Sequence, residues 1–283
     1  MTWTSRPPTR ADADAVVALV CAVDEADFGA PDYDLDALLG EWSEPGVDLD
    51  RDAVVFERDG RLAAYGLVLG EDGRAWVHPE HRGHGLGTAL AEAVETRARA
   101  RGAATLAQDV APGNERAKVL LAARGYALEH VFARLVLPAD RAAALAEPAG
   151  VRPFEPSDEA AAADVIARAF ATTGLRPAPA EVARVQWPDT SLWFVTEDGA
   201  SGAVRAQLRD GDEGWIAEIG VDPAAGGRGL GTALLHAAAR ALAARGARHV
   251  ALSVRASNQG ALRLYRRLGF EGDWGVERHV KRL

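Results

Sequence analysis

Alternating apolar and polar residues predict three strands in the second half of the chain, at residues 191–196, 202–208 and 215–221. Clusters of Asp and Gly separate these segments, as expected for the turns of an antiparallel meander. From Leu230 the apolar residues follow helical spacing as far as Ala241, and Gly246 stands where the helix would end. Residues 250–254 predict a buried strand, and residues 258–268 predict a second helix. The pattern therefore predicts an α/β domain in which a glycine-rich loop leads from a strand into a helix.

The glycine-rich segment occurs twice in the chain. Residues 77–102 align with residues 221–246 at an offset of 144, and 13 of the 26 positions are identical, which is far more than chance would give. The same offset, without any insertion, relates Asn114 to Asn258. Self-similarity at a fixed distance is the sequence sign of repeated structural units, so we expect two copies of one domain.

The beginnings of the two copies are also alike, because Arg6 and Asp12 have the same spacing as Arg152 and Asp158. The apolar run at residues 15–23 follows two arginines and could imitate the core of a signal peptide. Its recurrence in the middle of the chain instead indicates a structural element. An alanine-rich piece between two prolines marks the boundary. We predict an N-terminal domain at residues 1–138, a linker at 139–150 and a C-terminal domain at 151–283.

Length and composition fit two ordinary globular domains. The chain has 283 residues, of which 48% are hydrophobic and 26% charged, and this excludes disorder and collagen-like repeats. The single cysteine, Cys21, can form neither an internal disulfide nor a cysteine-based zinc site, so a reducing cytoplasm is the expected compartment. A net charge of −9 argues against nucleic acid as a partner. The longest apolar run has nine residues, too few to span a membrane.

A glycine-rich loop of this kind can bind an anion. Glycines let the backbone approach a ligand, the amide N–H groups point outward, and the helix dipole favours negative charge, so pyrophosphate is the expected ligand. No lysine precedes Thr88 or Thr232, which argues against a Walker A triphosphate site. The spacing of Gly83, Gly85 and Gly87 also differs from the dinucleotide-binding fingerprint and follows a predicted meander.

The segment Val-x-Pro-x-x-Arg-Gly-x-Gly-Leu-Gly, followed by Asn and then by Leu-Tyr-x-x-x-Gly-Phe, resembles the signature of the GCN5-related N-acetyltransferase (GNAT) superfamily. The resemblance implies two tandem GNAT domains of the α/β class, each a mixed, largely antiparallel twisted sheet flanked by helices. It implies acetyl-CoA as the acetyl donor, with the pantetheine arm beside the strand that ends at Val221, and no metal. The CoA contacts that it implies are Ile219, Val221, Gly226, Gly227, Arg228, Gly229, Leu230, Gly231, Thr232 and Asn258 in the second copy, and Val77, Arg82, Gly83, His84, Gly85, Leu86 and Gly87 in the first.

The resemblance further implies that the second copy is the catalytic one. Tyr265 stands where the family has its general acid, whereas the first copy has Leu121. Glu218 is a candidate base, directly or through water, and its counterpart is Arg74. Each candidate has a purely structural alternative, as a half-buried helix aromatic or an outward-facing strand carboxylate. The loop arginine is present as Arg82 but is glycine in the second copy, so we expect weakened but retained CoA binding there.

Other polar and aromatic clusters have weaker functional interpretations. Three histidines recur at every third residue of the first loop and could suggest a metal, although turn residues beside a phosphate site are the preferred interpretation. Acidic clusters could attract a cationic substrate or could be solvated turns. Two tryptophans could line an acceptor pocket or belong to the core. These residues are His78, His81 and His84; Asp24, Glu25 and Asp27; Asp32, Asp34 and Asp36; Asp210, Asp212 and Glu213; and Trp187 and Trp193.

The predicted function is direct acetyl transfer from acetyl-CoA to a primary amine of a small molecule, catalysed by the C-terminal domain. A narrower alternative is acetylation of a cysteinyl amine, because the tandem architecture and length resemble the mycothiol synthases of actinobacteria. A CoA-binding pseudoenzyme that acts as a sensor or scaffold is a different class, and a protein-lysine acetyltransferase is another. The expected partner is a small-molecule amine, with neither nucleic acid nor membrane, and the chain is expected to be a monomer or homodimer.

Overall fold

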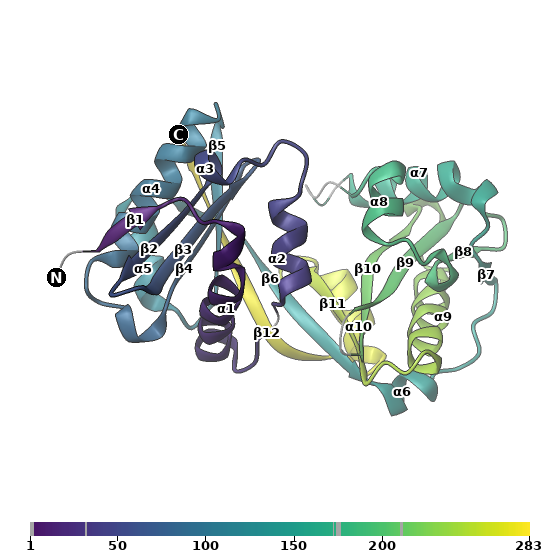
Figure 1. Ribbon diagram of the computed structural model, residues 1–283. Helices are drawn as coiled ribbons and strands as arrows, with labels where there is room; N and C mark the ends of the chain where they lie inside the picture. The colour runs from purple at the N-terminus through teal and green to yellow at the C-terminus, as the bar shows by residue number, and fades with distance from the viewer. Residues whose placement is uncertain (1–2, 32, 172, 174–176, 210–211) are drawn as a thin grey trace. The chain divides into compact units, whose positions relative to one another are not determined.

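The computed structural model describes residues 3–31, 33–171, 173, 177–209 and 212–283, which belong to two compact units. Unit 1 contains Met1–Phe132 and Gly275–Leu283, and unit 2 contains Ala133–Trp274 (Figure 1). Each unit thus takes its last strand from the other half of the chain. The domain bounds 1–138 and 151–283 remain a prediction about the sequence repeats. The boundaries between the compact units fall inside two strands, at residues 132/133 and 274/275.

Unit 1 is a sheet of strand order β1-β2-β3-β4-β5-β12. Its neighbouring strands are antiparallel, except that β4 and β5 are parallel. Its elements are β1 (Thr4–Arg6), α1 (Ala13–Phe28), α2 (Leu35–Trp42), α3 (Leu49–Asp52), β2 (Ala53–Arg58), β3 (Arg61–Leu69), β4 (Asp72–Val77), α4 (Leu86–Ala100), β5 (Thr105–Val110), α5 (Glu115–Ala123), the first part of β6 (Ala127–Pro138) and the last part of β12 (Glu271–Arg282).

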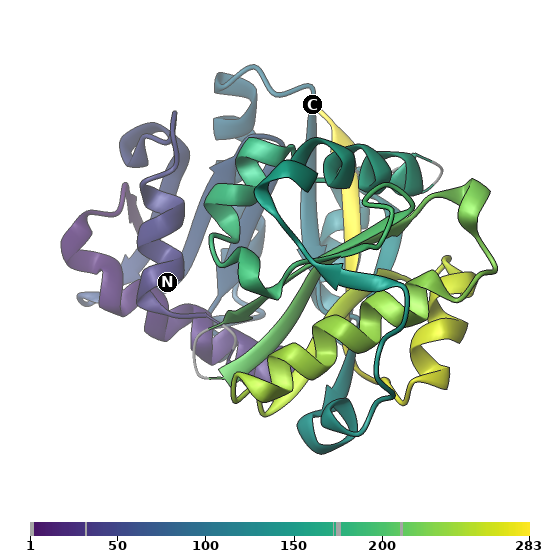
Figure 2. The same ribbon diagram turned by 90° about the vertical axis from the view of Figure 1, so that its right-hand side faces the viewer.

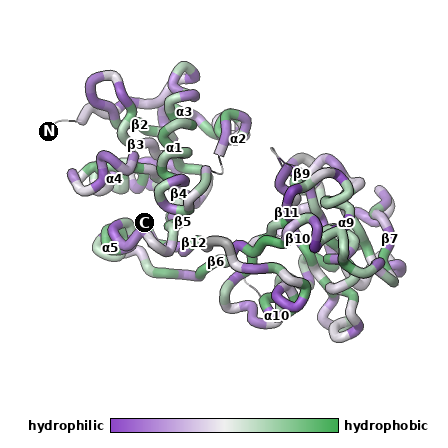
Figure 3. The backbone as a smooth tube through the Cα atoms, turned by 90° about the horizontal axis from the view of Figure 1, so that it is seen from below, coloured by the Kyte–Doolittle hydropathy of each residue, from purple (hydrophilic) through white to green (hydrophobic). Residues whose placement is uncertain are grey.

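Helices cover both faces of the unit 1 sheet. Val54 and Val55 are adjacent in β2 but pack into different clusters, the first with Val94 of α4 and the second with Val16 of α1. Because side chains alternate between the faces of a strand, α4 and α1 lie on opposite faces. Figure 3 colours much of β2 and β3 as hydrophobic, in agreement with their burial. The apolar run at residues 15–23 is therefore part of a core helix.

Unit 2 repeats this plan with the strand order β6-β11-β10-β9-β8-β7. Its elements are α6 (Ala139–Ala143), β7 (Val151–Pro153), α7 (Glu159–Phe170), α8 (Ala180–Gln186), β8 (Phe194–Thr196), β9 (Gly202–Arg209), β10 (Glu213–Val221), α9 (Leu230–Ala244), β11 (His249–Arg255) and α10 (Gln259–Arg267). Ala203 packs on α7 and its neighbour Val204 on α9, so these helices cover opposite faces. Figure 2, seen from the β7 edge, shows this arrangement.

One predicted strand differs from the structure, and the predicted linker contains a short helix. The strand predicted at 191–196 begins only at Phe194, because Asp189 accepts a hydrogen bond from the Ser191 amide and caps a short 3₁₀ helix at Thr190–Leu192. The segment predicted as a linker contains α6, whose Ala142 is fully buried in the unit 2 core. A side-chain cap outweighs the strand pattern in the first segment, and the second segment packs against the unit 2 core.

The last strand of the chain is anchored in unit 1. β12 pairs with β5 from Glu277↔Val110 to Arg282↔Thr105. Lys281 binds Glu95 at 2.9 Å, and the amide of Leu283 donates to the carbonyl of Ala104 at 3.1 Å. In the same way, β6 neighbours β11 in unit 2, and the amide of Ala139 donates to Arg248. Each half of the chain therefore completes the sheet of the unit built mainly from the other half.

The matching beginnings of the two copies each form an Arg–Asp ion pair. Arg6 donates to both carboxylate oxygens of Asp12 at 2.8 Å, and Arg152 does the same to Asp158 at 2.7 Å. Asp158 also accepts from the Glu155 amide at 2.8 Å. The pairing with Arg152 lowers the pKa of Asp158 below its usual value. In each repeat this ion pair connects the first strand to the start of the first helix.

We expect Asp158→Asn to destabilise unit 2 by about 1–3 kcal/mol at pH 7, because it removes a charge-assisted pair. A lowered native pKa gives stability that is present above the unfolded value of about 4 and is lost as the pH falls through the native pKa. Urea unfolding should therefore separate the variant from the unchanged protein at pH 7, and the difference should shrink progressively as the pH is lowered below about 4. A difference that stays constant as the pH is lowered would contradict this role.

Candidate active site

Both copies of the glycine-rich loop have the same backbone conformation. Gly83 and Gly85 have φ angles of 83° and 79°, and Gly227 and Gly229 have φ angles of 76° and 80°. This left-handed region favours glycine, because a Cβ atom would crowd the backbone. Each loop ends at the start of a 15-residue helix, α4 or α9, whose first amides have no partner within the helix. The geometry fits an anion site in both units.

The loop arginine of unit 1, Arg82, forms an ion pair with a carboxylate. Arg82 donates to Asp27 of α1 through two bonds of 2.7 and 3.1 Å and to the Val77 carbonyl at 3.3 Å. Gly226 has φ −59° and ψ 157°, close to the −67° and 149° of Arg82, so the backbone there does not require glycine. The absence of an arginine at position 226 is therefore a difference in side-chain chemistry rather than in loop conformation.

An interruption in strand pairing lies beside the loop of unit 2. Within the described residues, β10 and β11 pair in parallel only along 213–215 and 249–251. β10 continues beyond this point to Val221, so its backbone groups on this side are available to an extended ligand. Ile219 and Val221, two of the predicted CoA contacts, pair with β9 on their other side and lie on the stretch of β10 that has no partner in β11 within the described residues. In unit 1, β4 and β5 share the pair Asp72↔Ala107.

A β-bulge turns Glu218 to the opposite face of the sheet from Ile216. Ile216 pairs with Ala206, and Glu218 pairs with Arg205, so Ala217 is an extra residue in β10. Ile216 packs in the cluster under α9, whereas Arg205 shares the α7 face with Ala203. The register of β3 with β4 has no such shift from Ala64↔Val77 to Leu69↔Asp72.

Glu218 is a buried, paired carboxylate. Its Oε2 accepts from Arg205 Nη1 at 2.7 Å, and its Oε1 accepts from the Ala178 amide at 2.7 Å. The side chains of Glu218 and Arg205 are 8% and 2% exposed. In unit 1 the charges are reversed, because Arg74 pairs with Glu41 of α2. The outward-facing alternative for Glu218 is therefore excluded.

Tyr265 lies on the other face of the same sheet. It is 7% exposed and belongs to the cluster that contains Leu234 of α9 and Val254 of β11. Burial raises the pKa of Tyr265 to about 12, so the hydroxyl stays protonated at neutral pH. Its helix, α10, is capped by Asn258, whose side chain accepts from the Ala261 amide at 3.1 Å. Asn258, predicted to contact CoA, thus has a demonstrated role as an N-cap.

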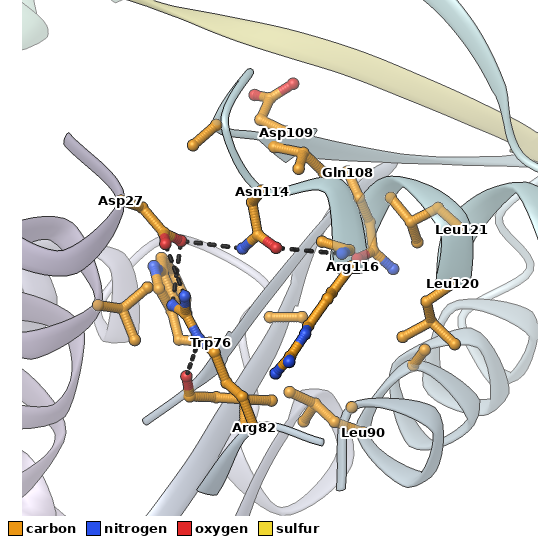
Figure 4. Close-up of a pocket in the computed structure, with 18 of the residues that line it drawn as sticks. Asp27, Trp76, Arg82, Leu90, Gln108, Asp109, Asn114, Arg116, Leu120 and Leu121 are labelled. Atoms are coloured by element: carbon orange, nitrogen blue, oxygen red, sulfur yellow. Dashed lines mark hydrogen bonds and ion pairs between the residues drawn. The ribbon is translucent and has the colours of Figure 1, made fainter. Parts of the chain in front are cut away.

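Unit 1 contains a cavity of about 350 Å³ beside its own loop. Figure 4 shows Asp27 bonded to Arg82 and Asn114, with Arg116 extending from α5 into the same space. Within the described residues, Arg116 has no ion-pair partner, and its Nη1 lies 3.5 Å from the ideal Cβ position of Gly83. The lining includes Gly83, Gly85, Gly87, Thr88, Leu90, Gln108, Leu120 and Leu121. The pocket therefore offers loop amides and arginines but has an apolar side chain where unit 2 has Tyr265.

Comparison with known proteins gives the same repeat. The model of the acetyltransferase (GNAT) family matches residues 19–126 and 163–270, which are again 144 residues apart. The chain belongs to the GNAT family. It is a tandem GNAT acyltransferase of the N-acetyltransferase class, as the sequence predicted, and the family uses acetyl-CoA.

The relatives of this GNAT protein match it over most of its length. It is 37% identical to mycothiol acetyltransferase of Kineococcus radiotolerans over 91% of this chain and 89% of that protein. It is 33% identical to mycothiol acetyltransferase of Thermobispora bispora over 95% of both chains. A GCN5-related N-acetyltransferase from Sphaerobacter thermophilus superposes with a TM-score of 0.85 and 32% identity, covering 99% of this chain and 95% of that chain. A tandem GNAT protein from the clavulanic acid biosynthesis pathway has a TM-score of 0.77 at 19% identity, covers 99% of this chain and 98% of that chain, and shares the fold.

The weaker clusters of the GNAT chain have structural partners. His81 packs against Trp3 with ring centroids 5.2 Å apart, and no group of three or more potential metal-ligating residues occurs in the described part of the chain. Among the acidic residues, Glu213 binds Arg134 and Asp212 binds Arg248, whereas Asp32 and Asp210 lie outside the described residues. Trp193 is 2% exposed and belongs with partly buried Trp187 to the core under α7, and Cys21 Sγ donates to the Tyr33 carbonyl. No helix among the described residues is long and apolar enough to cross a membrane.

Three residues of the GNAT sites were missed by sequence reasoning. Arg205 is a charged residue between Val204 and Ala206 in the apolar first part of β9, and this pattern could have indicated a buried ion pair. Asp27 belonged to an acidic cluster for which a cationic substrate and a solvated turn were both considered, and Arg116 had no distinguishing pattern. Their positions depend on contacts between segments distant in sequence.

Proposed function

We propose that unit 2 transfers an acetyl group from acetyl-CoA directly to a primary amine of a small molecule. The observation that supports this most is the placement of Glu218 and Tyr265 on opposite faces of the sheet. Between these faces lies the stretch of β10 that has no partner in β11 within the described residues. In direct acyl transfer the amine adds to the carbonyl carbon and the thiolate leaves from the same carbon, so one group must reach the nitrogen and another must reach the sulfur. Glu218 can accept a proton from the amine, and Tyr265 can donate one to the thiolate.

The proposed mechanism assigns a step to each part of the site. The amides of residues 227–232 hold the pyrophosphate, and the unpaired edge of β10 binds the pantetheine amides. Glu218 accepts a hydrogen bond from the amine and, directly or through water, the proton that nitrogen loses when it attacks the thioester carbon. Tyr265 donates a hydrogen bond to the developing thiolate and supplies the proton of the thiol formed when the C–S bond breaks. One proton leaves the amine and one reaches sulfur, so the step balances.

Unit 1 is proposed to bind CoA without transferring its acetyl group. Leu121 has no hydroxyl to protonate a thiolate, and Arg74 cannot accept a proton from an ammonium. The loop amides, Arg82 and Arg116 remain around the cavity and suit a pyrophosphate. Asp27 must release Arg82 before that arginine can bind a phosphate.

The acceptor that we favour is a cysteinyl amine of the kind acetylated by mycothiol acetyltransferases. Identities of 37% and 33% over at least 89% of each chain support this narrower proposal. Neither a sensor nor a scaffold needs a buried tyrosine and a buried carboxylate beside the donor site.

Thiol release from acetyl-CoA should be measured with a panel of amines that contains cysteinyl glycosides, aminoglycosides and lysine peptides. We expect turnover with a small amine, highest for the cysteinyl compounds, and acetylated products identifiable by mass spectrometry. Tight CoA binding with no amine-dependent thiol release would instead indicate a pseudoenzyme. Preference for lysine peptides would contradict a small-molecule acceptor.

A further inference from the structure

Arg205 is a permanently charged side chain inside the unit 2 sheet. The residue is 1% exposed, and its guanidinium carbon lies 5.1 Å from the centre of the Trp193 ring. Nη1 donates to Glu218 at 2.7 Å and to the Ala178 carbonyl at 3.2 Å, while Nε has no hydrogen-bond partner within the described residues. A hydrophobic pair at such a position is often as stable as an ion pair. Stability alone therefore gives no reason to keep this charge.

The bulge of β10 makes Glu218 the direct cross-strand partner of Arg205. Without the bulge, in which Ala217 is left out of the pairing, alternation would place Glu218 on the α9 face with Ile216. With it, Glu218 and Arg205 are direct cross-strand partners on the α7 face. Bulges re-aim side chains next to active sites, and unit 1, which lacks Tyr265, has no bulge between β3 and β4.

We propose that Arg205 is the positioning residue of the transfer reaction, holding the Glu218 carboxylate in place and aimed at the acceptor amine. The inference rests on the function proposed for Glu218 above. Arg205 and the Ala178 amide fix one oxygen each, and every carboxylate oxygen retains a lone pair for a further N–H donor. Arg205 touches neither substrate and acts through the carboxylate.

Among the described residues, the charged groups nearest this pair have partners of their own. Glu159 of α7 pairs with Arg184 of α8 at 2.8 Å. Arg255, at the end of β11, donates to the Thr173 carbonyl. Within the described residues, Arg205 is thus the cation that is hydrogen-bonded to Glu218.

The test is the pH profile of kcat/KM in Arg205→Met and Arg205→Lys. Removing an opposite charge favours the protonated carboxyl, so in Arg205→Met the acid limb should move up by about 1 pH unit or more. We expect kcat/KM for the amine at neutral pH to fall about 10-fold or more, with the KM for acetyl-CoA unchanged. Arg205→Lys should keep the acid limb near its original pH, because it keeps the charge. An unmoved acid limb in a folded Arg205→Met would overturn the proposal.

A double-mutant cycle separates positioning from folding. In a Glu218→Gln background, Arg205→Met replaces the ion pair with two neutral groups and should cause little further loss of kcat/KM. An equal loss in both backgrounds would overturn the positioning role. Arg152→Met is the matched control, since it breaks another arginine–carboxylate pair of unit 2 and should lower stability without moving the acid limb. If Glu218→Gln itself leaves turnover unchanged, the function proposed for Glu218 fails, a result that the cycle distinguishes from failure of Arg205.

Discussion

Tyr265→Phe is expected to lower kcat by about 100-fold or more, the usual contribution of a positioned acid, and to leave the Kd for CoA nearly unchanged. The substitution removes only the hydroxyl, so the packing of the ring with Phe270 and the α9 face is kept. Steady-state thiol release and calorimetric CoA titration would measure the two quantities. Because burial raises the pKa of Tyr265 to about 12, its ionisation should add no basic limb to the rate profile below about pH 11.

Tyr126→Phe is a matched control in unit 1. Tyr126 is 5% exposed, burial likewise raises its pKa to about 12, and its hydroxyl accepts a hydrogen bond from Gln108 at 3.2 Å. We expect this variant to keep its turnover, because the proposed chemistry takes place in unit 2. Equal losses in the two variants would point to a general effect on folding, and an unaltered rate in Tyr265→Phe would remove its role as the acid.

Gly229→Glu is expected to abolish turnover at ordinary acetyl-CoA concentrations. The residue has φ 80°, so any side chain is strained there, and a carboxylate would repel the pyrophosphate at the start of α9. No atom lies within 4 Å of the ideal Cβ position, so the effect should appear in donor binding more than in packing. A rise in the KM for acetyl-CoA of about 100-fold or more would correspond to the loss of roughly 3 kcal/mol of binding.

Gly85→Glu makes the same change in unit 1 at nearly the same backbone angle, φ 79°, and with the same free space around the Cβ position. The strain is therefore matched, and the two variants differ in which loop they damage. We expect turnover to be largely retained and CoA titration to lose one of two binding events. Loss of all activity in folded Gly85→Glu would overturn the assignment of catalysis to unit 2.

The sequence predicted the parts of the fold that local rules determine. The two loops were predictable because left-handed backbone positions require glycine, and the helices after them because apolar residues recur at helical spacing. The repeat predicted two similar units, and the GNAT signature predicted the family. The strand at Phe194 was placed too early, because a side-chain cap outweighed alternation.

The contacts that define the site were not predictable from spacing. The pair of Glu218 with Arg205 depends on a one-residue bulge, which leaves no sign in the pattern of β10. The pair of Arg82 with Asp27 joins residues 55 positions apart. Tyr265 and Glu218 could be named as candidates from the resemblance, whereas their placement on opposite faces required the register of the strands.

If catalysis is confined to unit 2 as proposed, the exchanged last strands give a structural reason for keeping the first copy. A duplicated domain that loses its chemistry is ordinarily free to be deleted. Here residues 133–138 of the first repeat belong to the sheet of unit 2, and Gly275–Leu283 of the second repeat belong to that of unit 1. Deleting either half would strip a strand from the survivor and expose a sheet edge. Each repeat is therefore needed for the fold of the other, whether or not it carries out chemistry of its own.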